Sequence, residues 1–137
     1  MKLSDDARRL LDAANIAHLS TLQDDGAPKV EPVWIAREGD RVLVTSDANS
    51  LKGRNLERDP RVAISIVDFD NPYEQLLIRG RVVEVRRDDD LAFLDTLAQR
   101  YTGAAFARRK WKQRAIYVIE PSIARHYRSP LIHNPSV

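Results

Sequence analysis

The spacing of hydrophobic residues changes near residue 16 and divides the chain into a helical start and a longer β-rich part. Between residues 3 and 14, apolar side chains recur every three or four positions, as on one face of a helix that Ser4 is placed to cap. From residue 16 onward, short apolar runs are separated by turn residues, which indicates antiparallel strands. We expect strands over residues 16–22, 30–37, 41–45, 62–68, 76–86 and 115–120, the last of them ended by Pro121.

Two further helical patterns interrupt these strands. Residues 50–58 form a short one that Asp59 and Pro60 would end, and residues 88–101 form the most regular one, with three aspartates at its start. Residues 104–112 are ambiguous, with a short helix as one interpretation. Six strands and three helices without a regular strand–helix alternation favour a small antiparallel barrel over a doubly wound parallel sheet. The sequence therefore predicts a mainly β fold in a single domain, residues 1–137.

The composition excludes several classes of site. With 137 residues, of which 43% are hydrophobic, the chain is long enough to bury one compact core. Because there is no cysteine, disulfides, thiolate metal sites and a cysteine nucleophile are excluded. No apolar run approaches the roughly 20 residues that a membrane span needs, and the N-terminal segment turns acidic at once, unlike a signal peptide. We therefore expect a cytoplasmic protein that contacts no membrane.

Charge and the common catalytic motifs point to no particular chemistry. The formal net charge is +2 with both signs interspersed, and the strands lack the aromatic and basic pattern of single-strand binders, so nucleic acid is not an expected partner. The three histidines, His18, His126 and His133, are far apart and show no metal-ligand spacing. The glycine-containing motifs of serine hydrolases, P-loop enzymes and dinucleotide-binding folds are also missing from the sequence.

One segment, residues 45–60, does carry a chemical signal. A strand ends there in Thr45 and Ser46, and a helix begins near Ser50 and Lys52. The free N–H groups and positive dipole of a helix start bind phosphates, and Lys52 and Arg54 add full charges. A solvated basic helix would show the same residues, so the segment alone leaves both interpretations open.

The order of several short motifs favours the phosphate interpretation. They lie at residues 18–22 (HLSTL), 25–28 (DGAP), 32–34 (PVW), 42–46 (VLVTS), 50–56 (SLKGRNL), 59–62 (DPRV) and 78–82 (IRGRV). Together they resemble the pyridoxamine 5'-phosphate oxidase-like family of flavin-binding split barrels, from about residue 16 to residue 85. The resemblance implies a split β-barrel of the FMN-binding type. It also implies a homodimer with a flavin-like cofactor at each subunit interface.

The same resemblance implies which residues contact the cofactor. They are Pro32, Val33, Trp34, Thr45, Ser46, Ser50, Lys52, Arg54 and Asn55. Lys52 and Ser50 would hold the cofactor phosphate with help from Arg54, and Thr45 and Ser46 would line the strand end beside it. The segment at residues 32–34 would run along the tricyclic ring. No metal is implied, and the catalytic residue and the proton donor stay unassigned.

Residue 51 bears on the choice of cofactor. Oxidases of this family that use FMN usually carry an arginine directly before the lysine, whereas this chain has Leu51. The segment is more similar to the branch that uses the deazaflavin coenzyme F420, whose polyglutamate tail would suit Arg54 and Arg58. The cations at residues 108–112 are better explained as ordinary exposed charges.

The F420 branch implies a reductase that transfers a hydride from the reduced deazaflavin to a conjugated or carbonyl-activated small molecule. Biliverdin-like and quinone-like compounds are of this kind. In such an enzyme the cofactor carries the chemistry and the protein positions ring and substrate, so an acid–base pair need not be visible in the sequence. An FMN-dependent enzyme of the oxidase type and a non-catalytic flavin- or tetrapyrrole-binding protein stay as alternatives.

Overall fold

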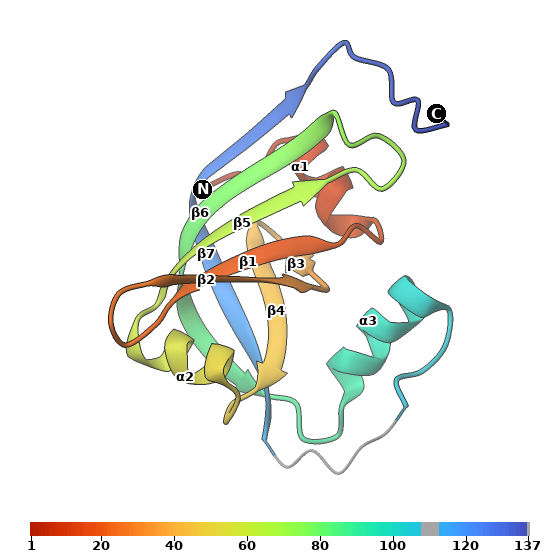
Figure 1. Ribbon diagram of the computed structural model, residues 1–137. Coiled ribbons are helices and arrows are strands. Elements are labelled where there is room, and N and C mark those ends of the chain that lie inside the picture. The colour runs from red at the N-terminus through yellow and green to blue at the C-terminus, as the bar shows by residue number, and fades with distance from the viewer. Residues whose placement is uncertain (108–112, 137) are drawn as a thin grey trace.

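The computed structural model describes residues 1–107 and 113–136, which contain seven strands and three helices (Figure 1). In chain order the elements are α1 (Asp5–Asp12), β1 (Ala17–Leu22), β2 (Pro28–Val33), β3 (Ala36–Glu38), β4 (Arg41–Asp47), α2 (Leu51–Arg58), β5 (Arg61–Val67), β6 (Glu74–Arg87), α3 (Ala92–Thr102) and β7 (Arg114–Arg128). The expected mainly β class is confirmed. None of the helices in the described ranges is long and apolar enough to cross a membrane.

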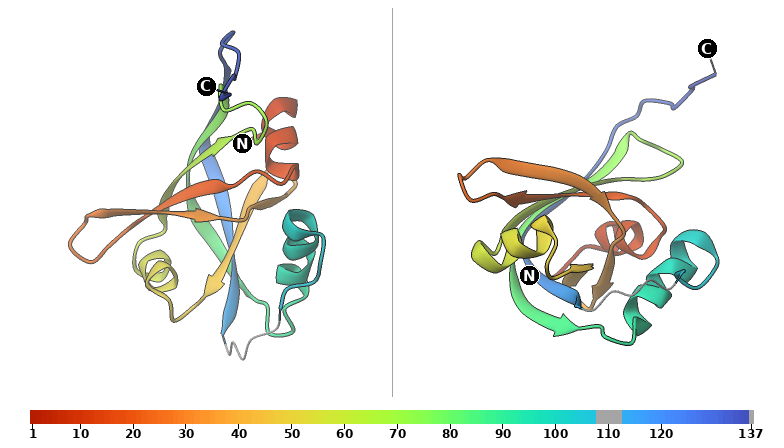
Figure 2. Two further views of the ribbon diagram at one scale, coloured as in Figure 1. Left: turned by 45° about the vertical axis from the view of Figure 1, so that its right-hand side comes forward. Right: turned by 60° about the horizontal axis from the view of Figure 1, so that its bottom comes forward.

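All seven strands form one antiparallel sheet in the order β2-β1-β5-β6-β7-β4-β3. The long strands β6 and β7 curve strongly, and the sheet curls around an interior (Figure 2). Strands β2 and β3 are its two edges, although only Trp34 and Ile35 separate them in the chain. A curled sheet with two separate edges is compatible with the expected split barrel.

Two strand predictions need correction. The strand expected over residues 30–37 is interrupted, because the chain passes from one edge of the sheet to the other between Val33 and Ala36; this gives seven strands instead of six. The predicted end of the last strand at Pro121 is wrong, since β7 continues to Arg128. The pairing of β7 with β4 stops at Ile119, so Pro121 lies where β7 has become an edge strand and a missing N–H donor is tolerated.

The third helix also begins later than expected. Strand β6 continues to Arg87 and α3 begins only at Ala92, so the predicted start at residue 88 is wrong. The buried carboxylate of Asp88 accepts hydrogen bonds from the N–H groups of Phe93 and Leu94, both at 3.0 Å, and caps the helix from outside it. Between them Leu91 adopts φ 61°, a left-handed conformation that is unusual for leucine and turns the chain into the helix.

Two hydrophobic clusters lie on opposite faces of β4 and β7. The larger one fills the curled sheet and includes Leu10 and Leu11 of α1, whose predicted cap is confirmed by a 3.1 Å hydrogen bond from Ala7 N to Ser4 Oγ. The smaller one packs α3 against the other face through Leu43, Leu97 and Val118. Successive strand residues point to opposite faces, so each of these two strands contributes to both clusters.

Candidate cofactor pocket

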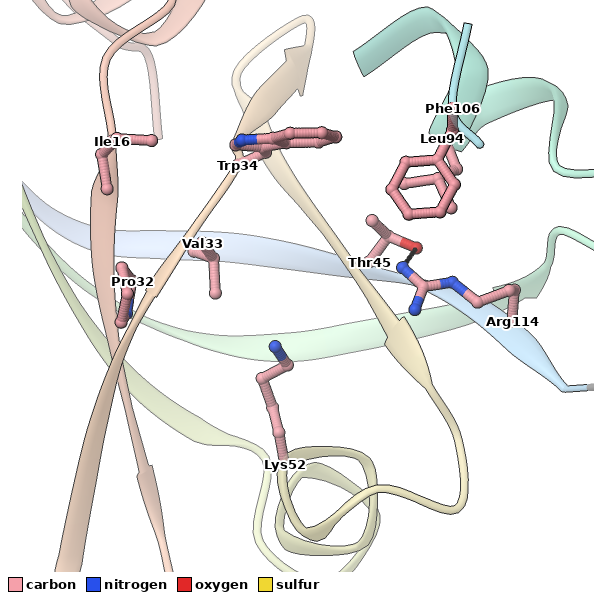
Figure 3. Close-up of a pocket in the computed structure, with 9 residues that line it drawn as sticks. All are labelled: Ile16, Pro32, Val33, Trp34, Thr45, Lys52, Leu94, Phe106 and Arg114. Atoms are coloured by element: carbon pink, nitrogen blue, oxygen red, sulfur yellow. Dashed lines mark hydrogen bonds between the residues drawn. The ribbon is translucent and has the colours of Figure 1, made fainter. Parts of the chain in front are cut away.

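A pocket of about 420 Å³ lies beside the end of β2, with walls that come from strands and from both α2 and α3 (Figure 3). Its lining consists of Ile16, Pro32, Val33, Trp34, Thr45, Lys52, Leu94, Phe106 and Arg114. Most of these side chains are apolar, and the charged ones are the two cations Lys52 and Arg114. A flat, largely apolar group with an anionic end therefore fits the lining chemically.

Lys52 brings the first positive charge into this pocket. It lies on the first turn of α2, its side chain is only 14% exposed, and its Nζ lies 2.7 Å from Oε1 of Glu31. Burial lowers the pKa of Lys52 from its ordinary value of 10.5, and the nearby charge of Arg114 lowers it further. A bound anion would counter both effects, so the electrostatics of the pocket favour an anionic ligand.

Arg114 brings the second positive charge; the sequence shows it at the end of a basic stretch but does not assign it to the cofactor site. It opens β7, and its Nη2 donates a 3.0 Å hydrogen bond to Oγ1 of Thr45, which in turn donates to the Ala115 carbonyl at 3.0 Å. Burial lowers the pKa of Arg114. In the sequence, Arg114 is also visible as a charged residue directly before the apolar run at residues 115–119. The pairing of β4 with β7 is what brings its side chain to Thr45.

The start of α2 is tightly determined by its neighbours. Ser50 Oγ accepts a 3.0 Å hydrogen bond from Gly53 N, donates to the Asp47 carbonyl at 2.7 Å and lies 2.8 Å from Ser46 Oγ. Gly53 packs so closely that a Cβ there would come within 2.6 Å of the carbonyl oxygens of Asp47 and Ala48. These contacts fix the helix turn from which Lys52 reaches the pocket.

The structure brings five of the nine predicted cofactor residues into the pocket lining and leaves four outside it. Those in the lining are Pro32, Val33, Trp34, Thr45 and Lys52. Ser46 and Ser50 lie behind the lining at the helix start, where their hydroxyls contact each other. Asn55 is fully buried and bonds Thr21 Oγ1 at 3.1 Å and Arg58 at 3.0 Å, which is a packing role.

Arg54 lies on another surface, in a groove of about 380 Å³ together with Leu51 and Arg58. The same groove contains Asp24 and Asp25, and Arg58 Nη1 lies 3.1 Å from Asp24 Oδ1. The residue before the lysine therefore faces this groove, and not the lining of the pocket. The predicted basic cluster at residues 108–112 lies outside the described residues.

Aromatic side chains connect α3 to the opposite side of the pocket. The Trp34 ring stacks on Tyr101 with centroids 5.2 Å apart and meets Phe106 edge-on at 6.1 Å. The Tyr101 hydroxyl donates to the Asn15 carbonyl at 2.6 Å and accepts from Ile35 N at 3.1 Å. Burial raises the pKa of Tyr101, so its hydroxyl keeps its proton near neutral pH.

A family model described as pyridoxamine 5'-phosphate oxidase matches residues 3–127 of this chain. The chain belongs to this family. A solved structure called F420 reductase is 33% identical, with a TM-score of 0.82, over 90% of this chain and 98% of that one. No curated protein matches the chain.

More distant solved structures share the fold alone. A conserved hypothetical protein from Mycobacterium tuberculosis is 20% identical, with a TM-score of 0.75, over 98% of this chain and 95% of that one. General Stress Protein 26 from Bacillus anthracis is 17% identical, with a TM-score of 0.69, over 90% of this chain and 92% of that one. The fold is therefore common to proteins with quite different descriptions, and a function has to be argued from the pocket.

Proposed function

We propose that this protein is an F420-dependent oxidoreductase that transfers a hydride from reduced deazaflavin to a conjugated or carbonyl-activated small molecule, such as a biliverdin-like or quinone-like compound. The observation that carries the proposal is one pocket that combines an apolar wall with the cations Lys52 and Arg114. It is supported by the 33% identity to the F420 reductase over nearly the whole of both chains. The cofactor, when bound, supplies the hydride.

The residues of the pocket fit such a cofactor. Val33 and Trp34 offer an apolar surface to a flat ring, and Lys52 offers a largely desolvated ammonium to a phosphate. Trp34 is held by its stack on Tyr101, so that side of the pocket presents a fixed apolar surface. The protein's contribution to the reaction is then to position ring and substrate against each other and to keep the space dry.

FMN is the second candidate cofactor. The family resemblance supports it, and the lining of the pocket accepts the ring of either flavin. The groove beside Arg54 and Arg58 favours F420, because Arg54 there suits a carboxylate of a polyglutamate tail while Arg58 is paired with Asp24. A non-catalytic flavin-binding protein is the third candidate, and turnover with the bound cofactor distinguishes it from the first two.

We also propose that the functional unit is a homodimer, in which the partner subunit covers the open side of the cofactor. Several apolar side chains of the described residues are exposed, among them Val83 and Val85 on β6. A second copy of the chain would cover surface of this kind. Light scattering at micromolar concentration tests the proposal, and a stable monomer would contradict it.

Fluorescence titration of F420 and of FMN is the experiment that tests the proposed function. We expect F420 to bind at least about tenfold more tightly than FMN. Screening of exposed ion pairs to the tail over a Debye length of roughly 8–10 Å should weaken F420 binding at high salt. Binding of FMN as tight as that of F420 would transfer the proposal to the FMN-dependent enzyme.

The variant Lys52→Ala tests the assignment of the pocket. Loss of one charge-assisted contact to a phosphate removes about 1.5–3 kcal/mol, so cofactor binding should weaken about ten- to a hundredfold. Turnover at saturating cofactor should change much less, because the phosphate is remote from the carbon that donates the hydride. The matched control is Glu57→Ala, an exposed residue of the same helix outside both the lining and the groove of Arg54. Equal cofactor binding by Lys52→Ala and the wild type would show that the pocket is wrongly assigned.

A further inference from the structure

Glu31 is a carboxylate that contacts the cation of the proposed phosphate site. It lies on β2 directly before residues 32–34, which line the pocket, and its Oε1 lies 2.7 Å from Lys52 Nζ. Its second oxygen pairs with Lys29 Nζ, so one carboxylate is shared between two ammonium groups. The Glu31 side chain is only 27% exposed, which limits screening by solvent.

A phosphate that approaches Lys52 therefore also approaches Glu31. Attraction to the ammonium and repulsion from the carboxylate both grow with the negative charge of the ligand, so the carboxylate removes more binding energy from a dianion than from a monoanion. A phosphate monoester carries about −1.5 to −2 charges near pH 7, because its second pKa is about 6. A phosphodiester has no second ionisation and carries a single negative charge.

The two candidate cofactors differ in this property. FMN ends in a phosphate monoester, whereas F420 joins its ring side chain to its tail through a phosphodiester. From the ion pair between Glu31 and Lys52, we propose that Glu31 is a specificity-determining residue that disfavours a dianionic monoester and thereby selects a phosphodiester cofactor. The inference rests on the proposed function and assigns to Glu31 an effect on which of the two cofactors binds more tightly.

The charges around the pocket set the size of the effect. A phosphate beside Lys52 is attracted by the cations of the lining and repelled by the Glu31 carboxylate, which lies 2.7 Å from the Lys52 ammonium. Lys29 lies outside the lining, yet it pairs with Glu31 and weakens the field of its carboxylate. We therefore expect a discrimination on the order of tenfold, well below that of an unpaired buried charge.

The experiment compares FMN with riboflavin, which has the same ring and no phosphate, in the wild type and in Glu31→Gln. The amide keeps the shape of the side chain and removes its charge. We expect FMN to bind on the order of tenfold more tightly to Glu31→Gln, with riboflavin unchanged and F420 changed by no more than about threefold. Lys29→Ala should act in the opposite direction, because it leaves the Glu31 carboxylate less neutralised.

A charge-matched control is Glu57→Gln, which removes one exposed carboxylate on α2 that lies outside the pocket lining. This control should leave the FMN-to-riboflavin ratio unchanged, and thermal unfolding should show that every variant is folded. An unchanged ratio in Glu31→Gln, or an equal gain for riboflavin or for F420, would overturn the inference. Wild-type protein that binds FMN as tightly as F420 would instead contradict the proposed function, since the riboflavin and FMN pair measures the repulsion without F420.

Discussion

The pocket has two walls that the chain builds in different ways. The α2 wall carries Lys52 on a helix start that is fixed by backbone packing at Gly53 and by the hydroxyls of Ser46 and Ser50. The α3 wall, which includes Phe106, is connected to the sheet by the stack of Trp34 on Tyr101 and by one tyrosine hydroxyl. The first wall depends on main-chain geometry, and the second depends on side chains that reach across.

This difference teaches where the protein can change and where it cannot. The helix turn that carries Lys52 is held by close backbone contacts, so it has little room to shift when a ligand binds. A wall that rests on aromatic contacts can be altered by a single substitution without moving the strands. We therefore expect damage to the α2 wall to affect folding and anion binding together, and damage to the α3 wall to affect mainly stability and pocket shape.

The variant Gly53→Ala should break the α2 wall and have the largest effect. Its Cβ would come within 2.6 Å of two backbone carbonyl oxygens, so the helix start has to move. We expect the free energy of unfolding to fall by about 1–3 kcal/mol, as in other overpacked sites, and cofactor affinity to fall by about tenfold. Chemical denaturation and fluorescence titration measure the two effects. The free energy of unfolding of Arg54→Ala, on the exposed side of the same helix, should stay within about 0.5 kcal/mol of the wild type. A Gly53→Ala variant as stable as the wild type would contradict the idea that backbone packing fixes the α2 wall.

The variant Tyr101→Phe sharpens the comparison from the other wall. It keeps the ring on Trp34 but removes the hydroxyl that bonds Ile35 N and the Asn15 carbonyl. We expect a loss of about 1 kcal/mol in the free energy of unfolding, with cofactor affinity within about threefold of the wild type, because Lys52 keeps its position. The exposed Tyr127 offers the matched control Tyr127→Phe, which should change neither quantity. A large loss of cofactor affinity in Tyr101→Phe would show that the two walls are not independent.

Glu74 belongs to neither wall and should give the smallest effect. Hydrogen bonds from Arg9, and then from His126 at 2.7 Å, lower the pKa of this buried carboxylate from its ordinary value of 4.5. A lowered pKa in the folded protein adds stability that is fully present above the unfolded value and lost as the pH falls through the folded one.

Glu74→Gln should therefore lower the free energy of unfolding by about 0.5–1 kcal/mol at neutral pH, since the partner Arg9 is half exposed. The difference between variant and wild type should shrink as the pH falls below 4.5. Urea denaturation between neutral pH and acid measures it, and cofactor affinity should not change. If the difference in the free energy of unfolding between Glu74→Gln and the wild type stayed constant over this range, ionisation of Glu74 would not contribute to the pH dependence of stability.

Much of the α2 wall could be predicted from the sequence, because its signals are local. The Ser50 cap, the helix end before Pro60 and the position of Lys52 depend on residues a few places apart. The same local reading placed Arg54 and Asn55 at the cofactor, but a helix turns about 100° per residue, so neighbouring side chains face different surfaces. Asn55 points into the core and Arg54 into the second groove.

The contributions of Arg114 and Glu31 could not be predicted, because they depend on strand register and on contacts between elements. Arg114 reaches Thr45 only through the pairing of β7 with β4, and Glu31 reaches Lys52 only where β2 passes α2. The division of residues 30–37 between two sheet edges has the same origin. Alternation of apolar residues predicts that a strand exists, but it does not say which neighbour the strand pairs with.

The two residues between β2 and β3 tie together opposite edges of the sheet. Such a short tether keeps the edges at a high effective concentration even where no backbone hydrogen bond joins them. None of the six strand pairings of the described residues joins these two edges, so the crossing itself is what links them. Trp34 lines the pocket and packs against the smaller hydrophobic cluster, while Ile35 is fully buried in the larger one, so a change at this crossing acts on the core as well as on the pocket. Substitutions that adapt the pocket to another ligand at this crossing should therefore also change the stability of the fold.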